Sequence, residues 1–182
     1  MPSNEVVIAE TKKWISNVVV GCNFCPFAAK EMKRGTVHYE VVRTGVRNKK
    51  LKQLTSAFLQ LNLDKTIETT LLIFPESFRS FDSFLQLIAN AEADLKKSGY
   101  EGVYQLASFH PDYLFEGAAD DDPANYTNRS LYPMLQLLRE SSLTIAIDNH
   151  RDPEGIPQRN ISFARKKGLA HMQVLREACF TF

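Results

Sequence analysis

The strongest constraint on the fold is an alternation of short β-like segments with longer helical ones. Segments 36–43, 69–74 and 102–109 are rich in β-branched or apolar residues, whereas apolar residues at helical spacing fill 48–61 and 81–97 between them. Strands joined by helical crossovers pair in parallel, and helices then cover both faces of the sheet. We therefore expect an α/β fold with a small central sheet flanked by helices.

Further helices are expected on either side of this core. Apolar spacing predicts a helix over 5–20, and a second, short one runs from Cys25-Pro26 to near Gly35. Three more are predicted over 132–140, 158–167 and 169–179. Segment 142–148 (SLTIAID) fits a fourth strand as well as a helix. No repeat or linker divides the chain, so residues 1–182 are expected to form a single domain.

Composition and charge exclude several classes of partner. The net charge of +1 favours neither nucleic acid nor an anionic membrane surface, both of which select a basic excess. The apolar runs are too short to span a bilayer, and the N-terminus lacks the features of a secretion signal. An odd count of three cysteines argues against a disulfide framework. We expect a cytoplasmic protein whose oligomeric state the sequence does not specify.

The segment from Ala107 to Pro133 is the candidate site. After an apolar run it is crowded with carboxylates, amides and aromatic residues, with one arginine. Loops of this length are uncommon in compact domains and are usually functional or disordered. Its tyrosines argue for order, because disordered segments are poor in aromatic residues. It would leave the carboxyl end of a strand, where ligands bind in sheets of this kind.

Two groups of residues in this segment suggest chemistry. His110 and Asp112 flank a rigid proline, which suits an acid/base histidine with a carboxylate that orients it. Arg129 follows Asn125 and Asn128, and a guanidinium beside two amides suits a carboxylate or phosphate. The alternative is that these residues only tie the loop to the core. The aspartates at 120–122 are interpreted mainly as turn residues, since they do not match a calcium-binding loop.

Cys22 and Cys25 form a C-x-x-C pair with three alternatives: a redox dithiol or half of a zinc site, a single reactive thiol, or two buried small residues. If Cys25 caps a helix that Pro26 begins, the free backbone donors should lower the pKa of its thiol. Cys25 is therefore a candidate nucleophile. Motifs for nucleotide binding, serine hydrolysis or a complete metal site are absent, so no metal is predicted and any cofactor stays unidentified.

Three motifs carry a resemblance to a known family. They are W-I-x-x-V-V-x-G-x-N-x-C-P-F-A (14–28), L-A-S-F-H-P-D-Y-x-F-x-G (106–117) and D-D-P-A-N-Y-T-N-R-S-x-Y-P (121–133). The chain resembles a bacterial family, domain of unknown function 1415, over nearly its whole length. It departs from the family pattern at Cys22, usually aliphatic, and at Leu131, usually proline. The resemblance implies no activity, because none is established for the family.

Three functions remain open from the sequence. The first is an enzyme acting on a small anionic metabolite, with His110, Asp112, Cys25 and the Arg129 clamp at the strand ends. The second is a metal- or anion-binding module that uses the same residues without turnover. The third is a structural or interaction protein in which the loop motif only builds the fold.

Overall fold

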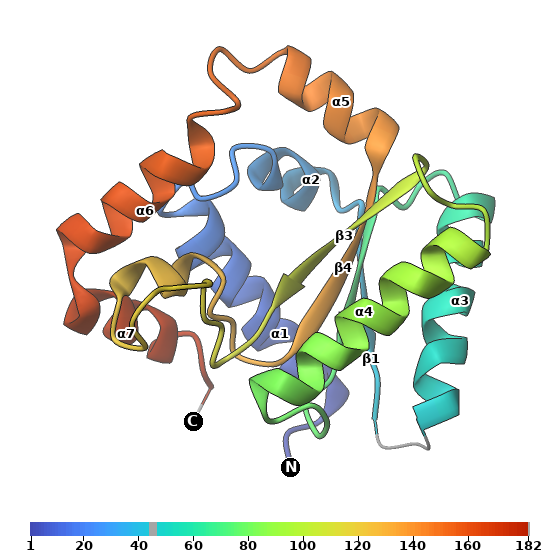
Figure 1. The fold of residues 1–182 in the computed structure, drawn as a ribbon, viewed down its shortest axis with the longest axis horizontal. Helices are drawn as coiled ribbons and strands as arrows, with labels where there is room; N and C mark the ends of the chain where they lie inside the picture. The colour runs from blue at the N-terminus through green and yellow to red at the C-terminus, as the bar shows by residue number, and fades with distance from the viewer. Residues whose placement is uncertain (44–46, 182) are drawn as a thin grey trace.

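A four-stranded sheet with helices on both faces forms the described part of the chain, residues 1–43 and 47–181 of a computed structural model (Figure 1). The strands are β1 (Val37–Val41), β2 (Thr69–Ile73), β3 (Tyr104–Phe109) and β4 (Met134–Arg139). The α-helices are α1 (Asn4–Trp14), α2 (Ala28–Arg34), α3 (Arg47–Leu63), α4 (Phe81–Lys97), α5 (Glu140–Asp148), α6 (Ile156–Lys167) and α7 (Leu169–Glu177). A π-helix η1 (Ile15–Val20) and a 3-10 helix η2 (Pro123–Thr127) complete the list. The predicted α/β class is confirmed.

The sheet has the order β1-β2-β4-β3, and β4 is an antiparallel strand that the sequence did not predict. β1 and β2 pair in parallel, as predicted. β3 does not pair with β2, because β4 lies between them and is antiparallel to both. The three predicted strands still run in one direction, so the carboxyl ends of β1, β2 and β3 share one edge of the sheet.

The helix predicted over 132–140 is wrong, since this segment contains β4. As an interior strand, β4 is buried on both faces, and Met134, Leu135 and Leu137 are all at most 1% exposed. Such strands lack the alternation of apolar and polar residues that marks a half-exposed strand. Leucine and methionine are also good helix formers, which favoured the wrong prediction. The ambiguous segment 142–148 is helical and belongs to α5, which begins directly where β4 ends.

The other predicted helices are confirmed, with local differences. The first predicted helix comprises α1 and η1, and its last turns widen into a π-helix before Gly21. A side chain could not replace hydrogen at Gly21, because its Cβ would lie 2.2 Å from the carbonyl oxygen of Asn17. The second helix starts at Ala28, three residues later than Cys25. Within the described residues no helix has the length and apolar character needed to cross a bilayer.

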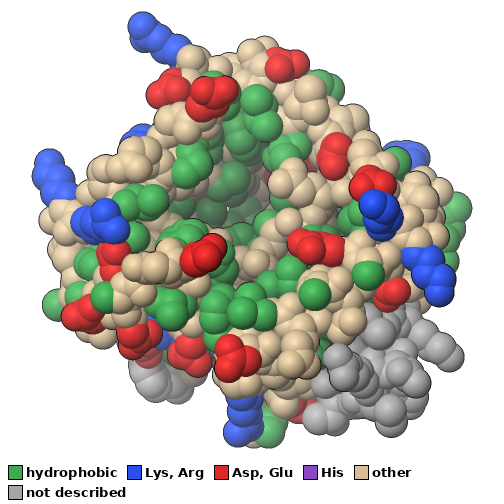
Figure 2. All heavy atoms as spheres, viewed as in Figure 1, with side chains coloured by type: hydrophobic (Ala, Val, Ile, Leu, Met, Phe, Trp, Pro, Cys, Tyr) green, Lys and Arg blue, Asp and Glu red, His purple; other side chains and the backbone are tan. Residues whose placement is uncertain are grey.

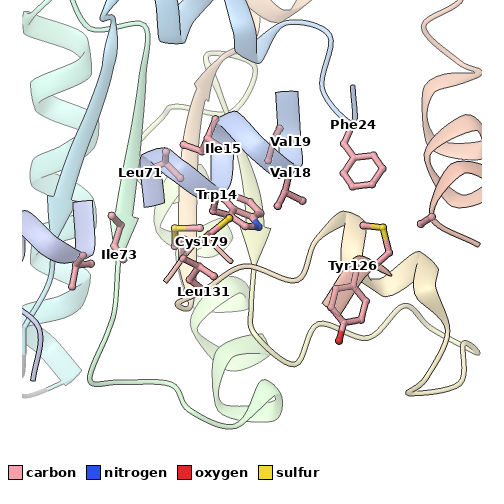
Figure 3. Close-up of a cluster of buried hydrophobic side chains, with 14 residues drawn as sticks. Trp14, Ile15, Val18, Val19, Phe24, Leu71, Ile73, Tyr126, Leu131 and Cys179 are labelled. Atoms are coloured by element: carbon pink, nitrogen blue, oxygen red, sulfur yellow. The ribbon is translucent and has the colours of Figure 1, made fainter. Parts of the chain in front are cut away.

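Successive side chains of each strand point to opposite faces of the sheet, so the core forms two layers. α3 and α4 cover one face of the sheet, called here the α4 face, where Leu72 and Leu135 are fully buried. The remaining helices lie on the opposite face, the α1 face (Figure 1). There Trp14 packs edge-on against Phe109, with ring centroids 5.3 Å apart. Figure 3 shows Trp14 among side chains from the sheet, from η1 and from the C-terminal segment.

A buried carboxylate joins the two ends of the chain. Glu10 on α1 is only 3% exposed. Its Oε2 accepts a hydrogen bond from the Tyr132 hydroxyl, and its Oε1 accepts one from the backbone N–H of Thr181 at 2.7 Å. Burial, followed by this bond to Glu10, raises the pKa of Tyr132, so the phenol remains a donor at neutral pH.

We expect Tyr132→Phe to lower the free energy of unfolding by about 1–3 kcal/mol, because one oxygen of the buried Glu10 loses its donor. Chemical denaturation monitored by circular dichroism measures the change. Tyr126→Phe is the matched control, since the Tyr126 hydroxyl makes no hydrogen bond to the described residues. Equal effects of the two substitutions would contradict a stabilising role for the Glu10 contact.

Candidate functional site

A cavity of about 840 Å³ lies on the α1 face of the sheet. Its walls come from the sheet, from α1 and η1, from the segment around Cys25 with α2, and from one side of α5. We call it the α5 cavity; its sheet wall consists of Val37, Thr69, Leu71, Ala107, Phe109, Gln136, Leu138 and Arg139. Figure 2 shows a hollow with apolar walls on this side of the molecule, below α5 as placed in Figure 1. Most of the lining is apolar, which is typical of pockets for small molecules.

Two residues of α6 hold the segment before α2 against this cavity. Arg159 donates a hydrogen bond to the carbonyl oxygen of Asn23 at 2.7 Å. Asn160 donates one to the carbonyl oxygen of Phe24, also at 2.7 Å. Asn23 itself has a positive φ of 55°, which turns the chain sharply after η1. The result is that Cys25 lines the cavity, whereas Cys22 does not.

The prediction of a lowered pKa for the Cys25 thiol is wrong. Burial raises its pKa above the ordinary value, and the backbone N–H groups of Phe27 and Ala28 oppose this only in part. These two N–H groups are free backbone donors of the kind that the sequence predicts at the start of a helix. The effect of burial on the thiol pKa outweighs their effect. Burial also raises the pKa of Cys22. Both thiols are free in the structure and remain protonated at neutral pH.

His110 is fully buried, and both of its ring nitrogens have partners. Nδ1 accepts the backbone N–H of Asp112 at 3.0 Å, so Nε2 carries the proton and donates it to the carbonyl oxygen of Phe78 at 2.8 Å. Phe81 and Phe84 pack against the ring. Burial is the largest influence on the pKa of His110 and lowers it. Asp112 thus contacts the histidine through its backbone amide, and its side chain is exposed.

Asn125 and Arg129 bind the backbone of the long loop. Asn125 is fully buried, accepts the N–H of Phe115 at 3.1 Å and donates to the carbonyl oxygen of Ala119 at 2.9 Å. Arg129 donates from Nε to the carbonyl oxygen of Tyr113 at 3.0 Å. Its Nη2 reaches both the carbonyl oxygen and the carboxylate of Asp120, the latter at 2.7 Å.

Of the six residues that the sequence suggests for the site, the α5 cavity brings two together. Cys25 and Asn128 line it. His110, Asp112, Asn125 and Arg129 are not among its lining residues. Among the described residues, no group of three or more His, Cys, Asp or Glu is placed to hold a metal ion.

Sequence reasoning missed three features of the cavity: Glu68, Gln136 and the inner side of α5. The cavity extends from Phe109, the last residue of β3, to the amino ends of β1 and β2, where the sequence predicted no site. Gln136 is the only polar residue in the run M-L-Q-L-L, and this would have been a usable signal had the run been recognised as a strand. Glu68 and α5 carry no comparable signal.

Arg129→Met should lower the free energy of unfolding by about 1–3 kcal/mol, because the carbonyl oxygen of Tyr113 loses its donor and that of Asp120 keeps only the longer bond from Asn125. Arg165→Met is the matched control: Arg165 also pairs with an aspartate, Asp122, but its side chain is 57% exposed. Thermal unfolding should show a clear decrease in Tm for the first variant and a much smaller change for the second. Equal changes would argue against the loop contacts of Arg129.

Stability should depend on pH through His110. Its pKa is lowered in the folded protein, whereas the unfolded chain takes up a proton near the ordinary value of about 6.5. The contribution of neutral His110 to the free energy of unfolding is therefore complete above about pH 6.5 and is lost as the pH falls below that value. Urea unfolding at several pH values should show a shallower decline for His110→Gln than for the wild type. The exposed His171 supplies the control, and His171→Gln should keep the wild-type slope; an unchanged slope in His110→Gln would refute the prediction.

Comparison with known proteins supports the resemblance seen in the motifs. Residues 6–174 match the family described as "Protein of unknown function (DUF1415)". No curated protein and no solved structure matches the chain at a significant level. Because the match covers nearly the whole chain, the protein belongs to the DUF1415 family.

Proposed function

We propose that this protein binds a small molecule with a largely apolar body in the α5 cavity. The observation that carries the proposal is the cavity itself, whose volume of about 840 Å³ lies within the range of ligand pockets. Its walls are apolar over most of their area and also carry polar side chains, among them Cys25, Asn128 and Gln136. Such a combination gives affinity through burial and orientation through hydrogen bonds.

The attachment of α5 supports this proposal. None of its residues is buried, and Ile145 is 63% exposed although it lines the cavity. Leu143 and Ala146 lie on the same inner side. A molecule in the cavity would cover these side chains and supply the packing that α5 otherwise lacks. Weakly packed elements of this kind are the ones that respond to a ligand.

The enzyme hypothesis requires His110, Asp112 and Cys25 to reach one pocket. Only Cys25 lines the α5 cavity, and its raised pKa leaves little thiolate at neutral pH. The hydrogen bonds of His110, Asn125 and Arg129 favour a role in shaping the loop, and we assign them that role. Ligand binding without catalysis is therefore the function we favour. From the sequence, we expect the protein to be cytoplasmic.

The test uses 3-phenylpropan-1-ol as an apolar probe. We expect calorimetry to show binding to the wild type, with a change in the fluorescence of Trp14, the only tryptophan and a lining residue. Ala146→Phe fills the cavity from α5 and should reduce affinity by about tenfold or more, corresponding to about 1.4 kcal/mol.

Thr144→Phe is the matched control on the same helix, since Thr144 is exposed and does not line the cavity. It should bind the probe as the wild type does. Absence of binding to the wild type, or an equal loss in both variants, would refute binding in the α5 cavity.

A further inference from the structure

An unpaired carboxylate oxygen distinguishes one end of the α5 cavity. Glu68 directly precedes β2 and lines the cavity. Its Oε1 is buried and has no hydrogen-bond partner. Among the described residues only two other buried side-chain atoms share this state, Thr70 Oγ1 and Tyr104 OH, and neither residue lines this cavity. A buried oxygen without a donor is costly. Because Glu68 lines the cavity, a ligand bound there can supply the donor.

A second acceptor lies on the sheet wall. Thr69 donates its only hydroxyl proton to the carbonyl oxygen of Leu137 at 2.7 Å. It can therefore only accept from Gln136, whose Nε2 lies 3.0 Å away. This arrangement fixes the orientation of the Gln136 amide and leaves its Oε1 without a hydrogen bond to the described residues. Gln136 pairs with Leu71 on β2 and Ala107 on β3, so it is the polar residue in an apolar part of the wall.

The positive side chains around the cavity are already engaged. Lys30 and Arg34, with side chains 72% and 56% exposed, both lie beside the carboxylate of Glu31. Arg139 donates to backbone carbonyl oxygens, among them that of Ile67. In the described part of the lining, these are the only Lys or Arg residues. The cavity thus offers unused acceptors, but no lysine or arginine that is free for an anion.

We infer that the ligand carries a primary ammonium group on its apolar body, with Glu68 and Gln136 as the acceptors. The inference rests on the proposed function. An ammonium has three donors and no acceptor, which matches a wall of two oxygens. A charge-assisted bond to a carboxylate is also stronger than a neutral one. Binding supplies the donor that the buried Glu68 oxygen lacks.

Three probes with the same apolar body test the inference: 3-phenylpropylamine, 3-phenylpropan-1-ol and 3-phenylpropanoate. In calorimetry at neutral pH the amine should bind the wild type about tenfold more tightly than the alcohol, and the carboxylate should bind most weakly. Glu68→Gln keeps the shape but removes the charge, so it should abolish the preference for the amine over the alcohol. Gln136→Leu, a second variant on another strand, should reduce the preference in part.

Glu31→Gln is the control, because Glu31 also lines the cavity but its carboxylate already accepts from Thr36 at 2.6 Å. It should retain the preference for the amine. If the alcohol binds and the amine binds no better, the inference fails while the proposed function stands. Tightest binding of the carboxylate would likewise overturn it in favour of an anionic ligand. If none of the three probes binds, the proposed function fails, and the inference fails with it.

Discussion

The arrangement of the molecule depends on the burial of β4. This strand pairs with β2 on one edge and β3 on the other, and helices cover both of its faces. β4 also runs directly into α5, so the end of the strand positions the helix that closes one side of the cavity. The same strand contributes Gln136, the polar residue of the cavity's sheet wall.

The long loop illustrates how residues that suggest chemistry can be used within the fold. A loop that packs against the core has backbone groups that water no longer reaches, and each of them needs a partner. His110 binds one such group, the N–H of Asp112, and the carbonyl oxygen of Phe78 outside the loop. Asn125 binds three groups of the loop, and Arg129 reaches carbonyl oxygens at both ends of the 113–120 turn. Side chains with several donors or acceptors suit this task for the same reasons that they suit ligands. Residue type alone therefore does not distinguish a ligand-binding site from a loop whose side chains bind the loop's own backbone.

The α5 cavity differs from the long loop, because it leaves a buried polar group without a partner. Its walls are largely apolar, yet the buried Oε1 of Glu68 has no hydrogen-bond partner among the described residues. A folded chain ordinarily satisfies such groups or exposes them to water. α5 also lacks packing here, because its cavity-lining residue Ile145 is 63% exposed. Both deficits lie around one cavity, and an amphipathic ligand would relieve both together.

Much of the fold follows from local pattern. The predicted strands at 36–43, 69–74 and 102–109 and the helix at 81–97 are present, because their apolar residues repeat at the period of the element they form. β4 could not be identified in this way, since an interior strand has no polar face and its leucines equally suit a helix. The candidate residues near the strand ends were identifiable by type, but whether His110 and Arg129 face a cavity or the loop backbone depends on how distant segments pack. The cavity is a property of tertiary structure alone: η1, α2, α5 and the strands of the sheet meet there from distant parts of the chain, and no local period encodes the space they leave.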